Sequence, residues 1–105
     1  MGDQVEKGKY ITGLRDGIWE YYYPDGSVKY SGYYVQGLPD GRHKYYYENG
    51  RLKEEQFYDM GLRQKTWKKY DEEGYVILTI NYKDDVEKRI NGVKVDLEQD
   101  VKRIR

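Results

Sequence analysis

The feature of this chain that most constrains its fold is a period of 24 residues. Trp19, His43 and Trp67 are separated by that step, and five further columns keep it in the same register. These columns are Tyr22, Tyr46 and Tyr70; Gly26, Gly50 and Gly74; Tyr10, Tyr34, Tyr58 and Tyr82; Gly13, Gly37 and Gly61; and Leu14, Leu38 and Leu62 with Val86 in the fourth place. Self-similarity at a fixed step indicates a repeat array, in which one small structural unit is stacked several times.

Each unit has the pattern of a β-hairpin. In the first unit an aromatic run, Ile18–Tyr23, is followed by Pro24-Asp25-Gly26 and by a returning run, Ser27–Tyr34. Pro-Asp-Gly is typical of a type I turn closed by a left-handed residue, because proline presets φ and glycine accepts φ above zero. A longer link, residues 36–41 in the first case, is expected to join one hairpin to the next. Such runs predict an antiparallel meander.

The predicted fold is all-β: an elongated single-layer antiparallel meander of repeated hairpins with a short C-terminal helix. The repeats are expected over residues 4–86, as a half unit (4–13) and three units (14–37, 38–61 and 62–85). A degenerate last unit and a helical cap are expected over 87–105, with the helix at Leu97–Ile104, where apolar residues recur at helical spacing. Residues 90–95 fit either a tight hairpin or a last degraded strand. The chain starts with a returning half-hairpin, as a fragment of a longer array would.

Composition narrows the function classes. Charged residues make up 36% of the chain, yet 16% is aromatic, including 14 Tyr, and disordered chains are poor in aromatics. The 19 Lys and Arg residues cancel the 19 Asp and Glu residues, which argues against a nucleic-acid partner and against general binding to anionic membranes. No cysteine is present, which excludes disulfides and thiolate metal sites. No bilayer-spanning apolar run and no signal peptide is visible, so the sequence does not indicate a localisation.

Alternation along each strand predicts which side chains share a face. Val28 is expected to lie with Tyr30 and Tyr34, and we expect Trp19 and Trp67 to make equivalent contacts in their units. The aromatic residues are either cross-strand packing or an exposed binding surface. The candidate binding surface consists of Trp19, Tyr21, Tyr23, His43, Tyr45, Tyr47 and Trp67.

The stretch Gly17-x-Trp19-x-x-Tyr22-Tyr23-Pro24-Asp25-Gly26, followed by Tyr34 and Gly37, resembles the bacterial variant of the MORN repeat. Later copies begin at Gly41 and near Trp67, and the resemblance covers about residues 4–86. It implies an elongated single-layer sheet of hairpins that contacts proteins or lipid headgroups and has no catalytic residue. For some bacterial members it also implies an antitoxin label or export from the cytoplasm. The chain departs from the pattern at His43 (for Trp), at Lys65 (for the Gly that opens the unit) and at Asp85 (for the linker Gly).

Residues able to carry chemistry are few. His43 is the single histidine and stands in the Trp column, so a packed ring is expected rather than a general base. With no cysteine, and with serines at positions 27 and 31 alone, no catalytic set, no metal site and no cofactor is expected. The acidic residues Asp84, Asp85 and Glu87 form either a solvated loop or a loose calcium site.

Basic residues gather around Trp67 in the sequence. They are either paired with neighbouring acidic residues across strands or available to anionic headgroups. This candidate basic patch consists of Arg63, Lys65, Lys68 and Lys69.

The expected function is that of a non-catalytic repeat module presenting an aromatic-rich β-sheet surface for protein–protein interaction or scaffolding. The alternatives are peripheral binding of anionic lipid headgroups through the basic patch around Trp67, and an antitoxin-like partnership with a toxin. A protein partner is expected ahead of membrane headgroups, and no nucleic acid. Self-association through an open sheet edge at Val5–Tyr10 is also expected, unless Lys7 and Lys9 repel a second strand.

Overall fold

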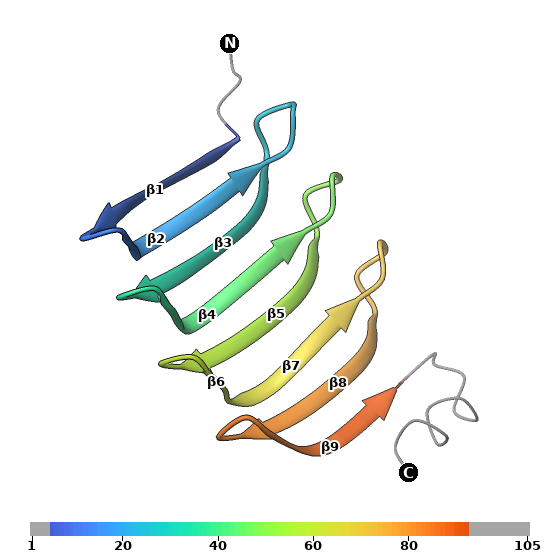
Figure 1. Cartoon of the computed structure of the whole chain (residues 1–105). Helices are drawn as coiled ribbons and strands as arrows, with labels where there is room; N and C mark the ends of the chain where they lie inside the picture. The colour runs from blue at the N-terminus through green and yellow to red at the C-terminus, as the bar shows by residue number, and fades with distance from the viewer. Residues whose placement is uncertain (1–4, 93–105) are drawn as a thin grey trace.

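The computed structural model describes residues 5–92 of the 105-residue chain, and these form one antiparallel sheet (Figure 1). The strands are adjacent in chain order, and the two-residue β6 pairs with β5 beside this path. The predicted all-β, single-layer meander is confirmed, and the sheet does not close on itself. The nine strands are β1 (Glu6–Ile11), β2 (Leu14–Tyr22), β3 (Val28–Val35), β4 (Leu38–Tyr46), β5 (Leu52–Asp59), β6 (Leu62–Arg63), β7 (Lys65–Tyr70), β8 (Val76–Lys83) and β9 (Val86–Gly92).

The predicted C-terminal helix over Leu97–Ile104 lies outside the described residues. Within residues 5–92, no helix long and apolar enough to cross a membrane is found. The strand alternative for the segment after Val86 is confirmed as far as Gly92, because β9 pairs with β8 along its length.

Two kinds of turn alternate along the sheet. In the first kind, the N–H of Gly26 donates to the carbonyl of Tyr23 (2.8 Å), and the N–H of Tyr23 donates to the carbonyl of Ser27 (2.8 Å). Gly26 has φ 93°, and Gly50 and Gly74 follow with 90° and 101°. The predicted type I turn closed by a left-handed glycine is therefore confirmed in all three units.

The second kind of turn is shorter than the predicted link of residues 36–41. Gln36 and Gly37 alone connect β3 to β4, with φ values of 50° and 86°, as a two-residue type I′ hairpin requires. The prediction of a long link was wrong because Pro39 and Gly41 resemble loop residues. In the structure they belong to β4, where the carbonyl of Pro39 accepts from the N–H of Gly61 (2.7 Å).

Each outgoing strand carries an irregularity near its start. Between the pairs Ser31↔Lys44 and Tyr33↔Asp40, β4 advances four residues while β3 advances two. The residue in this bulge has positive φ in every unit: 78° at Gly17, 74° at Gly41 and 64° at Lys65. Glycine suits two of these positions because it has no Cβ to clash there.

A second shift changes which side chains share a face. Tyr21 lies opposite Tyr30, but its neighbour Tyr22 lies opposite Val28, so β3 has one extra residue at this point. Val28 therefore leaves the face of Tyr30 and Tyr34, and its predicted grouping with them was wrong. Equivalent shifts occur at the pairs of Leu52 and Val76 with their partners.

The two faces of the sheet differ in character. We call the face that carries Trp19, His43 and Trp67 the aromatic face, and the opposite one, which carries Ile18 and Phe57, the polar face. The buried side chains, Trp19, Tyr30, His43, Gln56 and Tyr82, all belong to the aromatic face. The core of this thin molecule is thus a layer of rings on one side of a single sheet.

Candidate functional site

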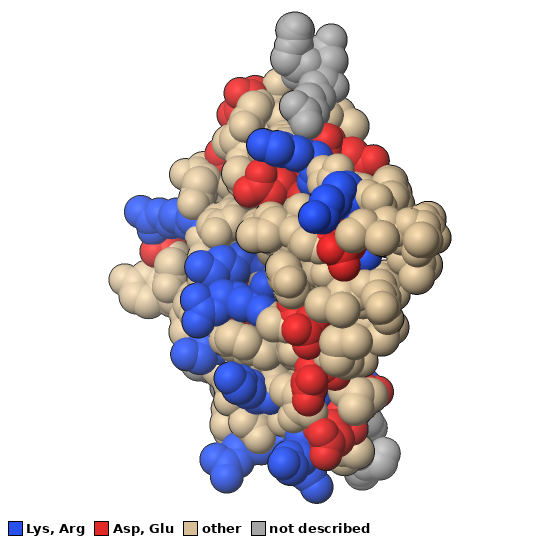
Figure 2. Space-filling model, turned by 90° about the vertical axis from the view of Figure 1, so that its left-hand side faces the viewer, with Lys and Arg blue, Asp and Glu red and all other residues tan. Residues whose placement is uncertain are grey.

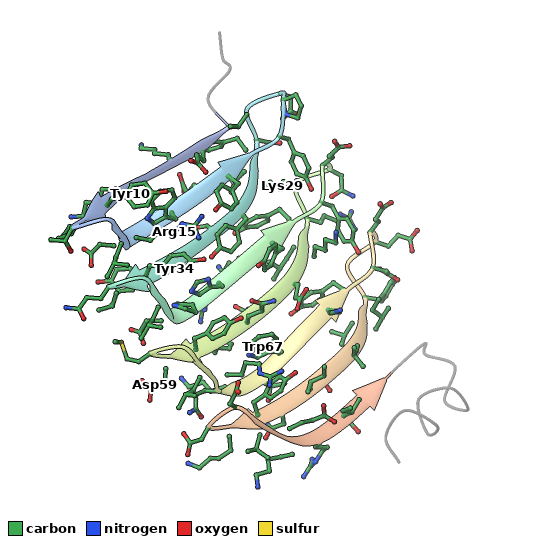
Figure 3. All side chains as sticks on the ribbon, in the orientation of Figure 1. Tyr10, Arg15, Lys29, Tyr34, Asp59 and Trp67 are labelled. Carbon is green, nitrogen blue, oxygen red and sulfur yellow. The ribbon has the colours of Figure 1, made fainter. Side chains whose placement is uncertain are left out.

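The aromatic face carries a continuous row of rings that crosses the sheet, and Tyr10, Arg15, Tyr34 and Trp67 mark it in Figure 3. Neighbouring rings meet edge to face, the arrangement that aromatic quadrupoles favour. The ring centroids are 4.9 Å apart for Tyr10–Trp19, 5.3 Å for Tyr34–His43, 5.1 Å for His43–Tyr58, 5.2 Å for Tyr58–Trp67 and 4.9 Å for Trp67–Tyr82.

Arginine completes the row where two rings do not touch. The guanidinium of Arg15 lies 4.9 Å from the ring centroid of Trp19 and 5.4 Å from that of Tyr34. It also donates to the hydroxyl of Tyr21 (2.7 Å). Cation–π contact and a hydrogen bond thus fix Arg15 as part of the packing.

The tryptophan column is anchored in the same way in every unit. Nε1 of Trp19 donates to the carbonyl of Lys9 (3.1 Å), and Nε1 of Trp67 donates to the carbonyl of Phe57 (3.0 Å). Both acceptors lie ten residues before the ring, on the preceding strand. The predicted equivalence of Trp19 and Trp67 is confirmed.

His43 reproduces the indole hydrogen bond with its own ring. Its Nε2 lies 2.9 Å from the carbonyl of Tyr33, an acceptor, so Nε2 carries the proton. Nδ1 is then the acceptor for the hydroxyl of Tyr30 (2.5 Å), and Tyr34 donates in turn to Tyr30 (2.9 Å). His43 is 2% exposed, and this burial lowers its pKa, against the opposing effects of the Tyr33 carbonyl and Asp40. With both nitrogens engaged and no access, His43 is a packed ring.

Mid-strand glycines give the rings their space, and no turn pattern reveals them. A Cβ at Gly8 would lie 2.1 Å from the ring of Trp19, and one at Gly32 would lie 2.2 Å from Nδ1 of His43. Both positions have glycine because a ring lies flat against the backbone there. Their even spacing from the ring column was the one sequence signal that pointed to them.

The seven residues of the candidate binding surface are largely occupied by internal contacts. Trp19 and His43 are each 2% exposed, and burial raises the pKa of Tyr45 to about 12. The hydroxyls of Tyr23 and Tyr47 donate to backbone carbonyls one unit further along, each at 2.6 Å. These residues lie together, as the repeat predicts, but as cross-strand packing.

The four residues of the candidate basic patch are divided between the two faces. Lys68 lies opposite Glu55 on the polar face, whereas Lys69 lies opposite Glu54 on the aromatic face. Arg63 stacks on Tyr82 (4.6 Å to the centroid) on the aromatic face and pairs with Asp85 at 2.6 Å. The remaining member, Lys65, reaches the ring of Phe57 on the polar face. One continuous patch of these four residues does not form, because adjacent strand residues point to opposite sides.

The acidic residues near position 85 form a two-residue turn. Asp84 and Asp85 have φ values of 49° and 72°. Asp85 is held by Arg63, which keeps the pKa of its carboxyl below the usual range, and Asp84 accepts from the side-chain amide of Gln64 (2.6 Å). Over residues 5–92, no group of three His, Asp or Glu side chains comes close enough to hold a metal ion.

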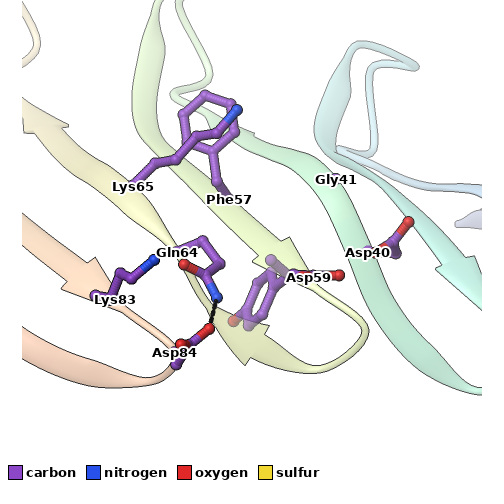
Figure 4. Close-up of a pocket in the computed structure, with 9 residues that line it drawn as sticks. Asp40, Gly41, Phe57, Asp59, Gln64, Lys65, Lys83 and Asp84 are labelled. Carbon is purple, nitrogen blue, oxygen red and sulfur yellow. Dashed lines mark hydrogen bonds between the residues drawn. The ribbon is translucent and has the colours of Figure 1, made fainter.

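A shallow pocket lies where β4, β5 and β7 meet (Figure 4). Phe57 forms part of its lining, and two cations flank this ring, Arg42 at 5.3 Å and Lys65 at 5.4 Å from the centroid. The other lining residues are Asp40, Gly41, Tyr58, Asp59, Gln64, Lys83 and Asp84. Its charged groups belong to the surface lattice of alternating signs and form no nucleophile–base pair.

The polar face holds an excess of positive charge. Figure 2, which looks onto the edge of the two-residue turns, shows basic side chains gathered along one side with acidic ones beside them. One ion pair, Arg42–Glu55 at 3.2 Å, links residues of this face in the part of the chain that the structure describes. Its basic residues are Lys7, Lys9, Arg42, Lys44, Lys65, Lys68, Lys83 and Arg89, against Asp16, Glu20, Asp40 and Glu55.

Comparison with known families agrees with this geometry. Residues 15–36 and 39–60 match the MORN repeat variant. The chain therefore contains two adjacent MORN repeats, which coincide with β2–β3 and β4–β5. The MORN repeat is generally a non-enzymatic module. No curated protein and no solved structure matches the chain.

Proposed function

We propose that this chain is a non-catalytic interaction module that presents its polar face to an acidic surface of a protein partner. The observation that carries the proposal is the contrast between the faces. The rings of the aromatic face pack on each other, whereas the lysines of the polar face lack ion-pair partners within residues 5–92. A rigid sheet with fixed cations suits an acidic partner, because charge complementarity steers association and fixes orientation.

Exposed apolar side chains among these cations support a protein partner. Ile18 is 62% exposed and Tyr33 is 44% exposed, and they lie opposite each other on β2 and β3. Lys7 and Lys9 line the same shallow depression. An apolar centre with a charged rim is the usual anatomy of a protein interface. A toxin, the partner that the family resemblance implies for some members, falls within this proposal where its surface is acidic.

The proposal is tested by affinity capture from cells with matched variants. Lys44→Gln with Lys68→Gln removes two cations from the polar face, while Lys29→Gln with Lys53→Gln removes two exposed or half-exposed cations elsewhere. We expect proteins retained by the unaltered chain and by the second variant to be lost by the first, and the retention to weaken with salt. Equal capture by all three proteins contradicts the proposal.

Anionic lipid headgroups are the second candidate, supported by the same cations. Co-sedimentation with vesicles of phosphatidylserine and phosphatidylcholine separates the two. Binding to anionic vesicles that disappears with Lys44→Gln and Lys68→Gln, without any protein captured, favours the lipid. Lys69→Gln serves as the internal control, because Lys69 lies on the aromatic face.

A further inference from the structure

We propose that the outer edge of β1 is a docking site for an antiparallel strand of another polypeptide, with an acidic residue opposite Lys7 and a bulky ring opposite Gly8. This edge site is separate from the polar-face surface proposed above. It rests on backbone geometry, and the two can fail independently.

The edge is open within the described chain. β1 is the first strand of the sheet and pairs with β2 alone, and all six of its residues are exposed. An edge strand presents unpaired N–H and C=O groups, which an incoming strand can satisfy while its side chains supply specificity.

Cross-strand charge pairs on the covered side indicate what the incoming strand should carry. Lys7 lies opposite Glu20, and Lys9 lies opposite Asp16, so both lysines face carboxylates of β2. The same two side chains stand on the polar face within reach of a strand on the open side. Opposite charges facing each other stabilise an antiparallel pair, and like charges destabilise it. An acidic strand is therefore favoured.

The repeat supplies the register of the incoming strand. Tyr21↔Tyr30, Tyr45↔Glu54 and Lys69↔Leu78 show one register for an outgoing strand against the returning strand that follows it. β1 is a returning strand, because Tyr10 belongs to the column of Tyr34. In that register the residue equivalent to Glu20 lies opposite Lys7, and the residue equivalent to Trp19 lies opposite Gly8.

Gly8 has room for a second ring. Gly32 lies opposite Trp19 of β2, while the ring of His43 from β4 covers its Cα. Gly8 is covered on one side by Trp19, and a ring on the incoming strand reproduces the two-sided environment of Gly32. Ring packing and the charge pair together define the chemistry of the occupant.

A second copy of this chain fits the edge less well. When two β1 strands pair antiparallel with their faces aligned, Lys7 meets either Lys9 or its own counterpart. Like charges then meet directly across the strands. The self-association expected from the open edge is for this reason replaced by an acidic partner strand.

The test uses a fluorescein-labelled peptide with the sequence of Leu14–Tyr22, which places Glu20 and Trp19 correctly. We expect saturable binding to the whole chain by fluorescence anisotropy, with amide chemical-shift changes concentrated in residues 5–11. Lys7→Glu should weaken binding about fivefold, because it turns an attractive pair into a repulsive one. A peptide with Glu20→Lys should restore binding to that variant.

Matched controls keep the outcome decisive. Lys53→Glu alters an exposed lysine away from β1 and should leave peptide affinity unchanged, as should Lys44→Gln with Lys68→Gln. Absence of peptide binding, binding indifferent to Lys7→Glu, or self-association through β1 in sedimentation experiments would each overturn the proposal.

Discussion

At the scale of single residues, His43 shows how one substitution in a repeat is accommodated by its neighbours. Imidazole is smaller than indole, and Tyr30 fills the difference by donating to Nδ1 over the open backbone of Gly32. The same contact gives Tyr30 a raised pKa, mainly through burial. The Trp position is therefore kept as a hydrogen-bonded ring site although the residue has changed.

Protonation of His43 should cost stability. Burial depresses its folded-state pKa, so the unfolded chain, with a pKa of about 6.5, binds the proton first. The stability that neutral His43 provides is complete above pH 6.5 and is lost as the pH falls towards the folded pKa. Urea unfolding should give a lower midpoint at pH 5.5 than at pH 7.5. His43→Phe should be less stable at pH 7.5 but should show little change between the two pH values; an unchanged pH dependence contradicts the assignment.

Lys65 is the strained member of the bulge column. Its φ of 64° lies in the left-handed region, where Gly17 and Gly41 stand in the other units. A non-glycine residue there costs about 1–2 kcal/mol, which the greater entropy of unfolded glycine offsets by about 0.5–1 kcal/mol. Lys65→Gly should therefore raise the free energy of unfolding by about 0.5 kcal/mol, measured by urea denaturation. Lys65→Ala keeps Cβ and loses the contact with Phe57, so it should bring no gain.

At the scale of elements, the two-residue turns decide how the hairpins follow one another. Their first residues, Thr12, Gln36, Met60 and Asp84, all have positive φ although none is glycine or asparagine. Each turn therefore stores strain that the adjoining strand pairs hold in place. Three of the four relieve part of it with glycine at the second position.

Changes within the second turn should show this strain. Gly37→Ala should lower the free energy of unfolding by 1 kcal/mol or more, on the order of the left-handed penalty, because φ is 86° and the new Cβ would also lie 3.3 Å from Leu14. Gln36→Asn should raise it by about 0.5 kcal/mol, since Asn-Gly suits a type I′ turn. Thermal unfolding followed by circular dichroism checks both. Opposite signs would show that the turn is not type I′ in solution.

β9 shows the limit of the repeat. Against β8 it advances one extra residue, not two, so Ile90 lies opposite Ile80 and Asn91 opposite Thr79. Asn91, which stands in the tryptophan column by sequence, therefore falls on the polar face. The row of rings ends at Tyr82 because the strand that follows brings an aliphatic side chain to the aromatic face.

At the scale of the whole molecule, one layer of sheet gives an elongated, thin particle. The principal extents are 45, 31 and 17 Å, and the Cα radius of gyration is 15.7 Å. A compact domain of this length has a radius near 13 Å. Stability must come from rings packed on one face, since no second layer covers the sheet within residues 5–92.

Small-angle X-ray scattering should report this shape. We expect a radius of gyration of at least 15.7 Å for the monomer, with a pair-distance distribution skewed to long distances. Size-exclusion chromatography with light scattering controls for the oligomeric state, since a dimer would also enlarge the radius. A monomer near 13 Å, the compact value, would mean that the sheet closes in solution.

The sequence by itself determined the period, the hairpins, the glycine-closed turns and the packed row of rings. These features depend on local physics: dihedral preferences at Gly26, and the fixed step that brings Trp19 and Trp67 to equivalent places. The family resemblance rested on the same columns. A type I′ turn at Gln36-Gly37 escaped detection because Pro39 and Gly41 lengthened the apparent loop.

The tertiary structure alone decided which residues share a face. Each bulge adds residues to one strand against its neighbour, so alternation counted along the sequence fails after Tyr22 and again around Lys65. That offset separates Lys68 from Lys69 in function and gathers the polar-face cations from strands far apart in the chain. Register is a property of two strands together, set by the hydrogen bonds between them, and one strand's sequence does not contain it.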